Sequence, residues 1–219
     1  MTRDELAGLI DHSVLKPEAS AVDVRIGADV VREWRIGYYC VQPCWVATAA
    51  RALAGSSSCV VAVIGFPHGC ERSAVKAAAA SLAVDDGADE LDMVVNIGAL
   101  KSGDAVAVRS DIGAVVRAAP GVVVKVILET GALTDEEKRL GCHLVRDAGA
   151  AFVKTSTGFH ASGGATVADV RLLRAAVGPD FGVKASGGIR SLADALAMLE
   201  AGASRLGTSA SAAILGAIA

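Results

Sequence analysis

Short apolar runs rich in Val and Ile alternate with Ala-rich segments of helical periodicity along the chain. The apolar runs predict eight strands, at residues 10–15, 37–42, 60–65, 90–96, 122–129, 152–156, 182–185 and 205–207. The segments between and after them predict helices, at residues 20–34, 46–53, 71–85, 102–118, 135–148, 167–177, 191–201 and 211–218. This alternation is typical of an α/β fold, the (β/α)8 TIM barrel, and we expect residues 1–219 to form a single barrel domain.

Start signals of two predicted helices support this pattern. Thr134 is followed three residues later by Glu137, and Ser191 by Asp194, which is the spacing of a capping box. The competing fold is a doubly wound open sheet, but the glycine fingerprint of that fold is missing after the first predicted strand. We therefore expect a closed barrel.

Polar side chains lie in or at the ends of four predicted strands. They form pairs with even spacing: Asp92 and Asn96, Lys125 and Glu129, Lys154 and Ser156, and Lys184 and Ser186. Because side chains alternate between the two faces of a strand, we expect both members of each pair on one face. Barrel enzymes carry their chemistry where strands end, so the pairs predict an active site at the C-terminal mouth.

Lys154 and Lys184 lie inside apolar runs that we predict to be buried. Burial disfavours the ammonium form and a second ammonium disfavours it further, so one of the two can be a neutral, nucleophilic amine near pH 7. Such an amine suits Schiff-base chemistry. The alternative is that each lysine extends to solvent or pairs with a carboxylate: Asp92 then only balances a buried lysine, and Lys125 with Glu129 forms a structural ion-pair network.

Composition and charge argue against several classes of function. A net charge of -3 gives no electrostatic reason to expect a nucleic-acid partner. The apolar runs are shorter than the roughly 20 residues of a membrane-spanning helix, and the acidic start of the chain is unlike a signal peptide, so we expect no membrane partner and a cytoplasmic location. The five cysteines and four histidines lack metal-ligand spacing, so we expect no metal and no cofactor.

Several motifs, in order along nearly the whole chain, closely resemble the deoxyribose-phosphate aldolase family. They are the segments at residues 10–15, 39–43, 91–98, 125–131, 153–159, 183–190 and 205–209. The resemblance implies a class I, metal-free aldolase that reversibly cleaves 2-deoxy-D-ribose 5-phosphate to D-glyceraldehyde 3-phosphate and acetaldehyde. The partners it implies are this sugar phosphate and acetaldehyde. Barrel enzymes of this size are often dimers, so we expect a homodimer.

The resemblance also assigns roles to single residues. The family's Schiff-base lysine falls on Lys154, its second lysine on Lys184 and its catalytic aspartate on Asp92, the last two as proton donor and acceptor. Asp11 and Ser13 match residues that support the water and proton network in the family. From its position one strand before Lys154, we expect a supporting role for Lys125 as well, together with Glu129. Phosphate binding is expected, through close backbone approach at small residues, from Thr157, Gly158, Gly187, Gly188, Gly207, Thr208 and Ser209.

Two alternatives stay open at this point. Another Schiff-base sugar-phosphate aldolase, acting on a keto substrate, would need the same lysine, and a non-catalytic sugar-phosphate-binding barrel would need the same glycines. Some family members use a tyrosine in a C-terminal tail for proton transfer, whereas the tyrosines of this sequence are Tyr38 and Tyr39. We therefore expect proton transfer to depend on Asp92 and Lys184.

Overall fold

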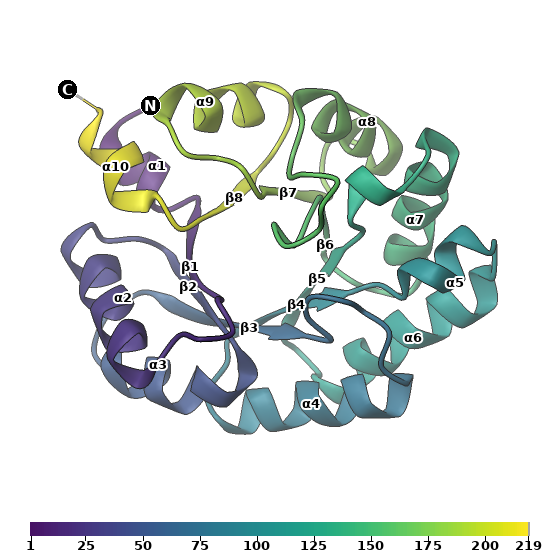
Figure 1. The fold of residues 1–219 in the computed structure, drawn as a ribbon, viewed down its shortest axis with the longest axis horizontal. Helices are drawn as coiled ribbons and strands as arrows, with labels where there is room; N and C mark the ends of the chain where they lie inside the picture. Colours follow the sequence, from purple (N-terminus) through teal and green to yellow (C-terminus); the bar gives the residue numbers. More distant parts are fainter. Residues whose placement is uncertain (219) are drawn as a thin grey trace.

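Eight parallel strands close into a barrel (Figure 1). The computed structural model describes residues 1–218. The strands are β1 (Ile10–Val14), β2 (Tyr38–Val41), β3 (Cys59–Ile64), β4 (Glu90–Val94), β5 (Val123–Ile127), β6 (Phe152–Lys154), β7 (Gly182–Ser186) and β8 (Arg205–Thr208). Each strand pairs with the next in chain order, and β8 pairs with β1. The barrel predicted from the sequence is confirmed.

Helices surround the barrel on its outside (Figure 1). They are α1 (Arg3–Ala7), α2 (Ala21–Glu33), α3 (Val46–Ala52), α4 (Ser73–Asp85), α5 (Ile97–Lys101), α6 (Ala105–Ala118), α7 (Asp135–Asp147), α8 (Val167–Val177), α9 (Leu192–Glu200) and α10 (Ser211–Gly216), with the 3-10 turns η1 (Pro43–Trp45) and η2 (Thr130–Ala132). The capping boxes predicted at Thr134 and Ser191 are both present, at the starts of α7 and α9.

Helices α1 and α5 were not predicted from the sequence. Each has five residues, too few for helical periodicity to appear. Asn96, which we expected at the end of a strand, instead caps α5, because its side-chain oxygen accepts a hydrogen bond of 3.0 Å from the Ala99 amide. Strand β4 therefore ends at Val94, and the expected placement of Asp92 and Asn96 on one strand face is wrong.

The strands are buried on both faces, as expected for a parallel sheet covered by helices. Their outward faces supply Val, Ile and Leu side chains to one large core beneath the helices. Inside the barrel, by contrast, buried charged residues project from β1 and from β4 to β8: Asp11, Glu90, Asp92, Lys125, Lys154, Lys184 and Arg205. The charged groups able to do chemistry are therefore concentrated in the barrel interior.

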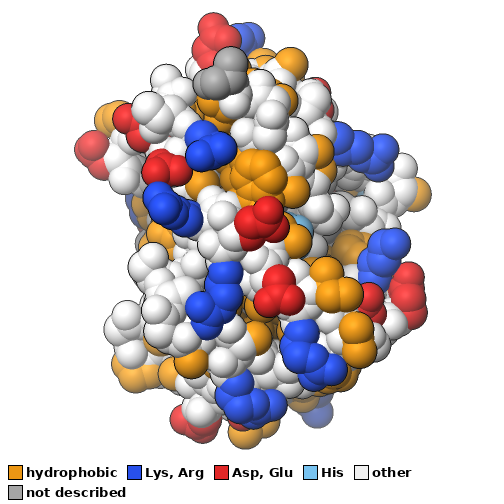
Figure 2. Space-filling model, turned by 90° about the vertical axis from the view of Figure 1, so that its left-hand side faces the viewer, with side chains coloured by type: hydrophobic (Ala, Val, Ile, Leu, Met, Phe, Trp, Pro, Cys, Tyr) orange, Lys and Arg blue, Asp and Glu red, His pale blue; other side chains and the backbone are white. Residues whose placement is uncertain are grey.

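The outer surface carries charges of both signs. On the face shown in Figure 2, Lys and Arg side chains are intermixed with Asp and Glu side chains. Across residues 1–218, the structure contains no helix with the length and apolar character needed to span a bilayer.

Candidate active site

Asp92, on β4, lies at the centre of the buried charges. Its Oδ2 accepts hydrogen bonds from the Nζ atoms of Lys154, at 2.6 Å, and Lys184, at 2.7 Å. Its Oδ1 accepts one from Lys125 Nζ at 2.9 Å. In the strand register Asp92 lies beside Lys125, and Lys154 lies beside Lys184. The contacts from β4 to β6 and β7 form because these buried side chains project into the barrel interior. The structure thus brings together the three residues predicted to be catalytic.

Three further residues, Glu90, Arg205 and Asp11, connect these contacts into a ring. Lys125 Nζ lies 2.6 Å from Glu90 Oε2, and Arg205 Nη1 lies 3.2 Å from Glu90 Oε2 and 3.2 Å from Asp11 Oδ1. Lys184 donates a hydrogen bond to the other oxygen of Asp11. We call the resulting closed circuit of alternating charges the charge ring; its members, in order, are Arg205, Glu90, Lys125, Asp92, Lys184 and Asp11.

Lys154 contacts the charge ring at Asp92 but is not a member of it. The ring's three cations and three carboxylates sum to zero when all are ionised, and among residues 1–218 the salt-bridge partner of Lys154 is Asp92, which two ring lysines already contact. Burial lowers the pKa of Lys154; Asp92 opposes this shift and Lys184 adds to it. For Lys184, burial is outweighed by Asp11 and Asp92, and its pKa is raised. Of the two lysines, Lys154 is the one biased toward the neutral amine.

The ring aspartates are held in their ionised form. Burial alone would raise the pKa of Asp11, but Lys184 and Lys125 outweigh it and lower the pKa. Burial likewise opposes ionisation of Asp92, yet Lys125, Lys154 and Lys184 together hold its pKa well below the usual value. Asp92 is therefore an anion that organises three amines around it.

Glu90 and Arg205 were missed by the sequence analysis. Arg205 begins β8, where its guanidinium carbon lies 3.2 Å from the centre of the Tyr38 ring and 5.5 Å from that of Phe152. Glu90 begins β4, two residues before Asp92. The spacing of two residues between Glu90 and Asp92 could have revealed Glu90, because it places both carboxylates on the inner face of one strand.

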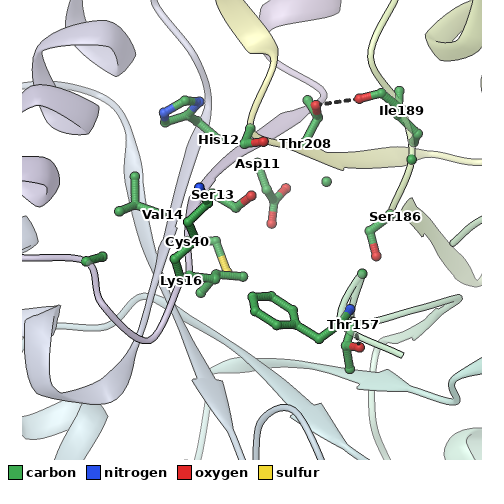
Figure 3. A pocket seen from close by; sticks show the side chains of 18 of the residues that line it. Asp11, His12, Ser13, Val14, Lys16, Cys40, Thr157, Ser186, Ile189 and Thr208 are labelled. Carbon is green, nitrogen blue, oxygen red and sulfur yellow. Dashed lines mark hydrogen bonds between the residues drawn. The ribbon is translucent and has the colours of Figure 1, made fainter. Parts of the chain in front are cut away.

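A cavity of about 700 Å³ opens above the charge ring at the C-terminal ends of the strands. Lys154, Lys184 and Asp11 line it, together with Cys40 and Ser13. Figure 3 shows Asp11 and Ser13 facing the same open space. Burial raises the pKa of the Cys40 thiol to about 11, so it is a neutral part of the wall.

All residues expected to bind phosphate line this cavity: Thr157, Gly158, Gly187, Gly188, Gly207, Thr208 and Ser209. The loops after β6 and β7 come into close contact at glycines. A side chain would not fit there, because a Cβ at Gly187 would lie 2.9 Å from Gly164 Cα and 3.3 Å from Gly158 Cα. Gly187 also has a φ of 86°, which favours glycine. Thr208 donates a hydrogen bond of 2.7 Å to the Ile189 carbonyl, drawn in Figure 3, and so connects β8 to the loop after β7.

Glu129 holds a different contact from the one predicted. The expected placement of Lys125 and Glu129 on one strand face is wrong, and so is the alternative of an ion pair between them, because β5 ends at Ile127 and Glu129 adopts a left-handed backbone with a φ of 60°. Its buried carboxylate instead accepts a hydrogen bond of 2.5 Å from the Thr157 hydroxyl and two of 3.3 Å from the Thr157 amide. Glu129 thereby fastens the loop that carries Gly158.

Two exposed cations also line the cavity without having been predicted. Lys16 follows β1, and Arg190 follows the glycines after β7. Their position in loops at the C-terminal mouth was the signal in the sequence. Residues 1–218 hold no group of three or more His, Cys, Asp or Glu side chains that is arranged to bind a metal ion.

A closed parallel barrel with buried amines beneath a cavity at the C-terminal ends of its strands has the architecture of a (β/α)8-barrel enzyme. Comparison with known proteins identifies the family. Residues 7–218 match the model of the DeoC/LacD family of aldolases, and the chain belongs to this family. The resemblance found in the sequence motifs is thereby confirmed.

Individual relatives agree with this assignment. A protein of Enterococcus faecalis, named deoxyribose-phosphate aldolase, is 54% identical over 96% of both chains. Among solved structures, a putative deoxyribose-phosphate aldolase from Coccidioides immitis superposes with a TM-score of 0.95 at 39% identity, over 99% of this chain and 86% of that one. The deoxyribose phosphate aldolase of Aeropyrum pernix, described as a tetramer, gives 0.91 at 34% identity, over 98% and 91%.

Proposed function

We propose that this protein is a class I aldolase that reversibly cleaves 2-deoxy-D-ribose 5-phosphate to D-glyceraldehyde 3-phosphate and acetaldehyde. The observation that carries the proposal is the position of Lys154: it lies at the floor of the cavity, beside a charge ring that is already neutral without it. An amine that is neutral near pH 7 is what imine formation requires. Relatives at 54% identity are named deoxyribose-phosphate aldolase, which supports 2-deoxy-D-ribose 5-phosphate as the substrate.

In the proposed reaction, Lys154 Nζ attacks the C1 aldehyde of the open-chain sugar, and loss of water gives an iminium ion. A base removes the proton of the C3 hydroxyl, the C2–C3 bond breaks, and its electron pair moves toward the iminium to give an enamine. C3 leaves as the aldehyde carbon of glyceraldehyde 3-phosphate. Protonation of the enamine at C2 and hydrolysis of the imine then release acetaldehyde and restore the amine.

We assign the proton transfers to Asp92 and Lys184. Both donors on Asp92 Oδ2, Lys154 and Lys184, lie within 2.7 Å of that oxygen, so the reacting nitrogen and the second lysine share one acceptor. A proton can pass between them without any movement of the backbone. Lys125 and Asp11 hold Asp92 and Lys184 in place through the ring contacts.

We assign the phosphate to the glycine-lined side of the cavity. The loops after β6, β7 and β8 supply backbone amides there, and small residues let an anion approach them closely. Binding the phosphate at these loops orients the other end of the sugar toward the floor, where Lys154 lies. Remote binding of this kind lowers the entropic cost of reaching the reactive geometry.

Borohydride trapping tests the proposal. The protein is incubated with deoxyribose 5-phosphate or acetaldehyde, reduced with sodium borohydride, and digested for peptide mass spectrometry. We expect a reduced adduct on Lys154 that is absent in Lys154→Leu, while Lys101→Leu, which removes an exposed lysine on α5, serves as the matched control. A folded wild-type protein without any lysine adduct would remove the aldolase assignment.

We also propose that residues 1–219 act as one barrel domain in the cytoplasm and that the protein self-associates. The phosphorylated substrate supports the location, since such a sugar is charged and does not cross membranes unaided. The tetrameric description of the Aeropyrum pernix relative supports self-association. Light scattering coupled to size-exclusion chromatography measures the mass: a homodimer is the expected outcome, and a monomer at micromolar concentration contradicts it.

A further inference from the structure

The charge ring reaches one layer deeper into the barrel than the cavity does. Asp11 and Lys184 line the cavity, whereas Glu90 and Arg205, on the far side of the ring, do not appear in its lining. Both far-side residues are nevertheless buried, with 7% and 6% of their surface exposed. A buried ion pair of this kind is costly unless its charges are matched, so its presence beneath a reactive amine calls for a reason.

We propose that Glu90 and Arg205 are positioning residues that set the proton occupancy of Lys154 from the far side of the charge ring. This inference rests on the proposed function, in which Lys154 is the amine that forms the imine. Glu90 acts through Lys125 and Asp92, and Arg205 acts through Asp11 and Lys184. Neither residue touches the substrate cavity.

The physical reason is the charge balance of a buried cluster. The titratable groups around Lys154 are Asp92 from β4, Lys184 from β7 and Cys40 from β2, and the Cys40 thiol is neutral. With the ring neutral, a proton on Lys154 leaves one uncompensated positive charge in a medium of low dielectric constant, where charges interact strongly over several ångströms. A neutral Lys154 avoids that excess charge.

The two far-side residues must then have opposite effects. Without the Glu90 carboxylate the ring carries an excess positive charge, which disfavours a further proton on Lys154. Without the Arg205 guanidinium the ring carries an excess negative charge, which a proton on Lys154 neutralises. The double replacement removes one charge of each sign and restores the balance.

The test measures imine formation as a function of pH in four full-length proteins: wild type, Glu90→Gln, Arg205→Met and the double variant. The rate of borohydride-trapped acetaldehyde adduct on Lys154 is followed by mass spectrometry between about pH 5 and 9, a range that brackets the neutral pH at which lysine nucleophiles are tuned to work. Only the neutral amine reacts, so the trapping rate falls as the pH is lowered; we call this part of the pH–rate profile the acidic limb. We expect the acidic limb to move to lower pH in Glu90→Gln and to higher pH in Arg205→Met, by roughly half a pH unit or more. The double variant should return toward the wild-type limb.

A matched control separates this effect from loss of stability. Asp169→Asn also removes a carboxylate from a lysine contact, the 2.7 Å pair with Lys138 between α7 and α8 outside the barrel, and should leave the limb unchanged. Limbs that stay in place, or that move in the same direction in both single variants, overturn the inference. Glu90→Gln preserves side-chain shape and decides the question alone if Arg205→Met does not fold. A wild-type protein without any adduct would instead refute the proposed function.

Discussion

Replacing Thr157 with valine removes one hydroxyl from the wall of the cavity while keeping the shape of the side chain. That hydroxyl donates to Glu129 at 2.5 Å and accepts a hydrogen bond of 3.1 Å from the Phe159 amide. Thr157→Val leaves the buried Glu129 carboxylate with the two longer bonds from the Thr157 amide. The turn that carries Gly158 toward Gly187 therefore loses its shortest connection to the barrel.

The expected magnitude follows from the bond that is lost. A hydrogen bond to a charged group contributes about 1.5–3 kcal/mol, and about 1.4 kcal/mol corresponds to a tenfold change in an equilibrium constant. Since Gly158 belongs to the proposed phosphate site, we expect kcat/KM for deoxyribose 5-phosphate to fall about 10- to 100-fold if the full bond energy is lost in the transition state. Unphosphorylated 2-deoxyribose, which has no anion to place there, should show a smaller loss.

Steady-state kinetics with both sugars checks this prediction, with urea unfolding alongside to record any change in stability. Thr157→Ser keeps the hydroxyl and is the matched control, so it should stay close to wild type with both substrates. Equal losses for the phosphorylated and unphosphorylated sugar in Thr157→Val would show that the contact between Thr157 and Glu129 does not serve the phosphate end. Wild-type kinetics in Thr157→Val would refute the reasoning altogether.

Three further predictions concern other parts of the barrel. Gly207→Ala places a Cβ 2.8 Å from Ser186 Cβ and 3.3 Å from Lys184 Cε, so we expect the displaced lysine to lower kcat at least ~10-fold, as measured at saturating substrate; an unchanged kcat would contradict this. Lys76→Met leaves the buried Asp111 carboxylate, 2.6 Å away in the wild type, without its cation, and urea unfolding should show a loss of about 3–5 kcal/mol, most of which Lys76→Met/Asp111→Leu recovers. Asp11 and Asp92 have folded-state pKa values below the ordinary value of ~3.9. The stability that their ionised forms contribute is therefore present above that pH and is lost as the pH falls through the folded-state values. The midpoint of urea unfolding should decline from pH 6 to pH 2, and a midpoint that stays constant would contradict the ring contacts.

The strand pattern was accessible from the sequence because each strand is a short apolar run buried on both faces, bounded by helix start and end signals. The pattern did not predict where β4 and β5 end, because a polar side chain after each strand makes a contact that the spacing of residues does not reveal. Asn96 continues an apolar run in the sequence, but its amide caps α5 instead. Glu129 lies at even spacing from Lys125, yet a left-handed turn after Ile127 sends its carboxylate to Thr157.

For the site, local patterns were enough to place Lys154, Lys184 and Asp92 on inner strand faces near the C-terminal mouth, because strand alternation and apolar context are properties of short segments. The contacts of Arg205 on β8 with Glu90 on β4 and Asp11 on β1, by contrast, arise from the folded barrel. The contact with Asp11 joins β8 to β1, which are neighbours only because the barrel closes, and the contact with Glu90 reaches across the barrel interior. Both therefore depend on closure and strand tilt, which no local pattern contains. The neutrality of the charge ring, and with it the distinction of Lys154, is a property of the closed barrel.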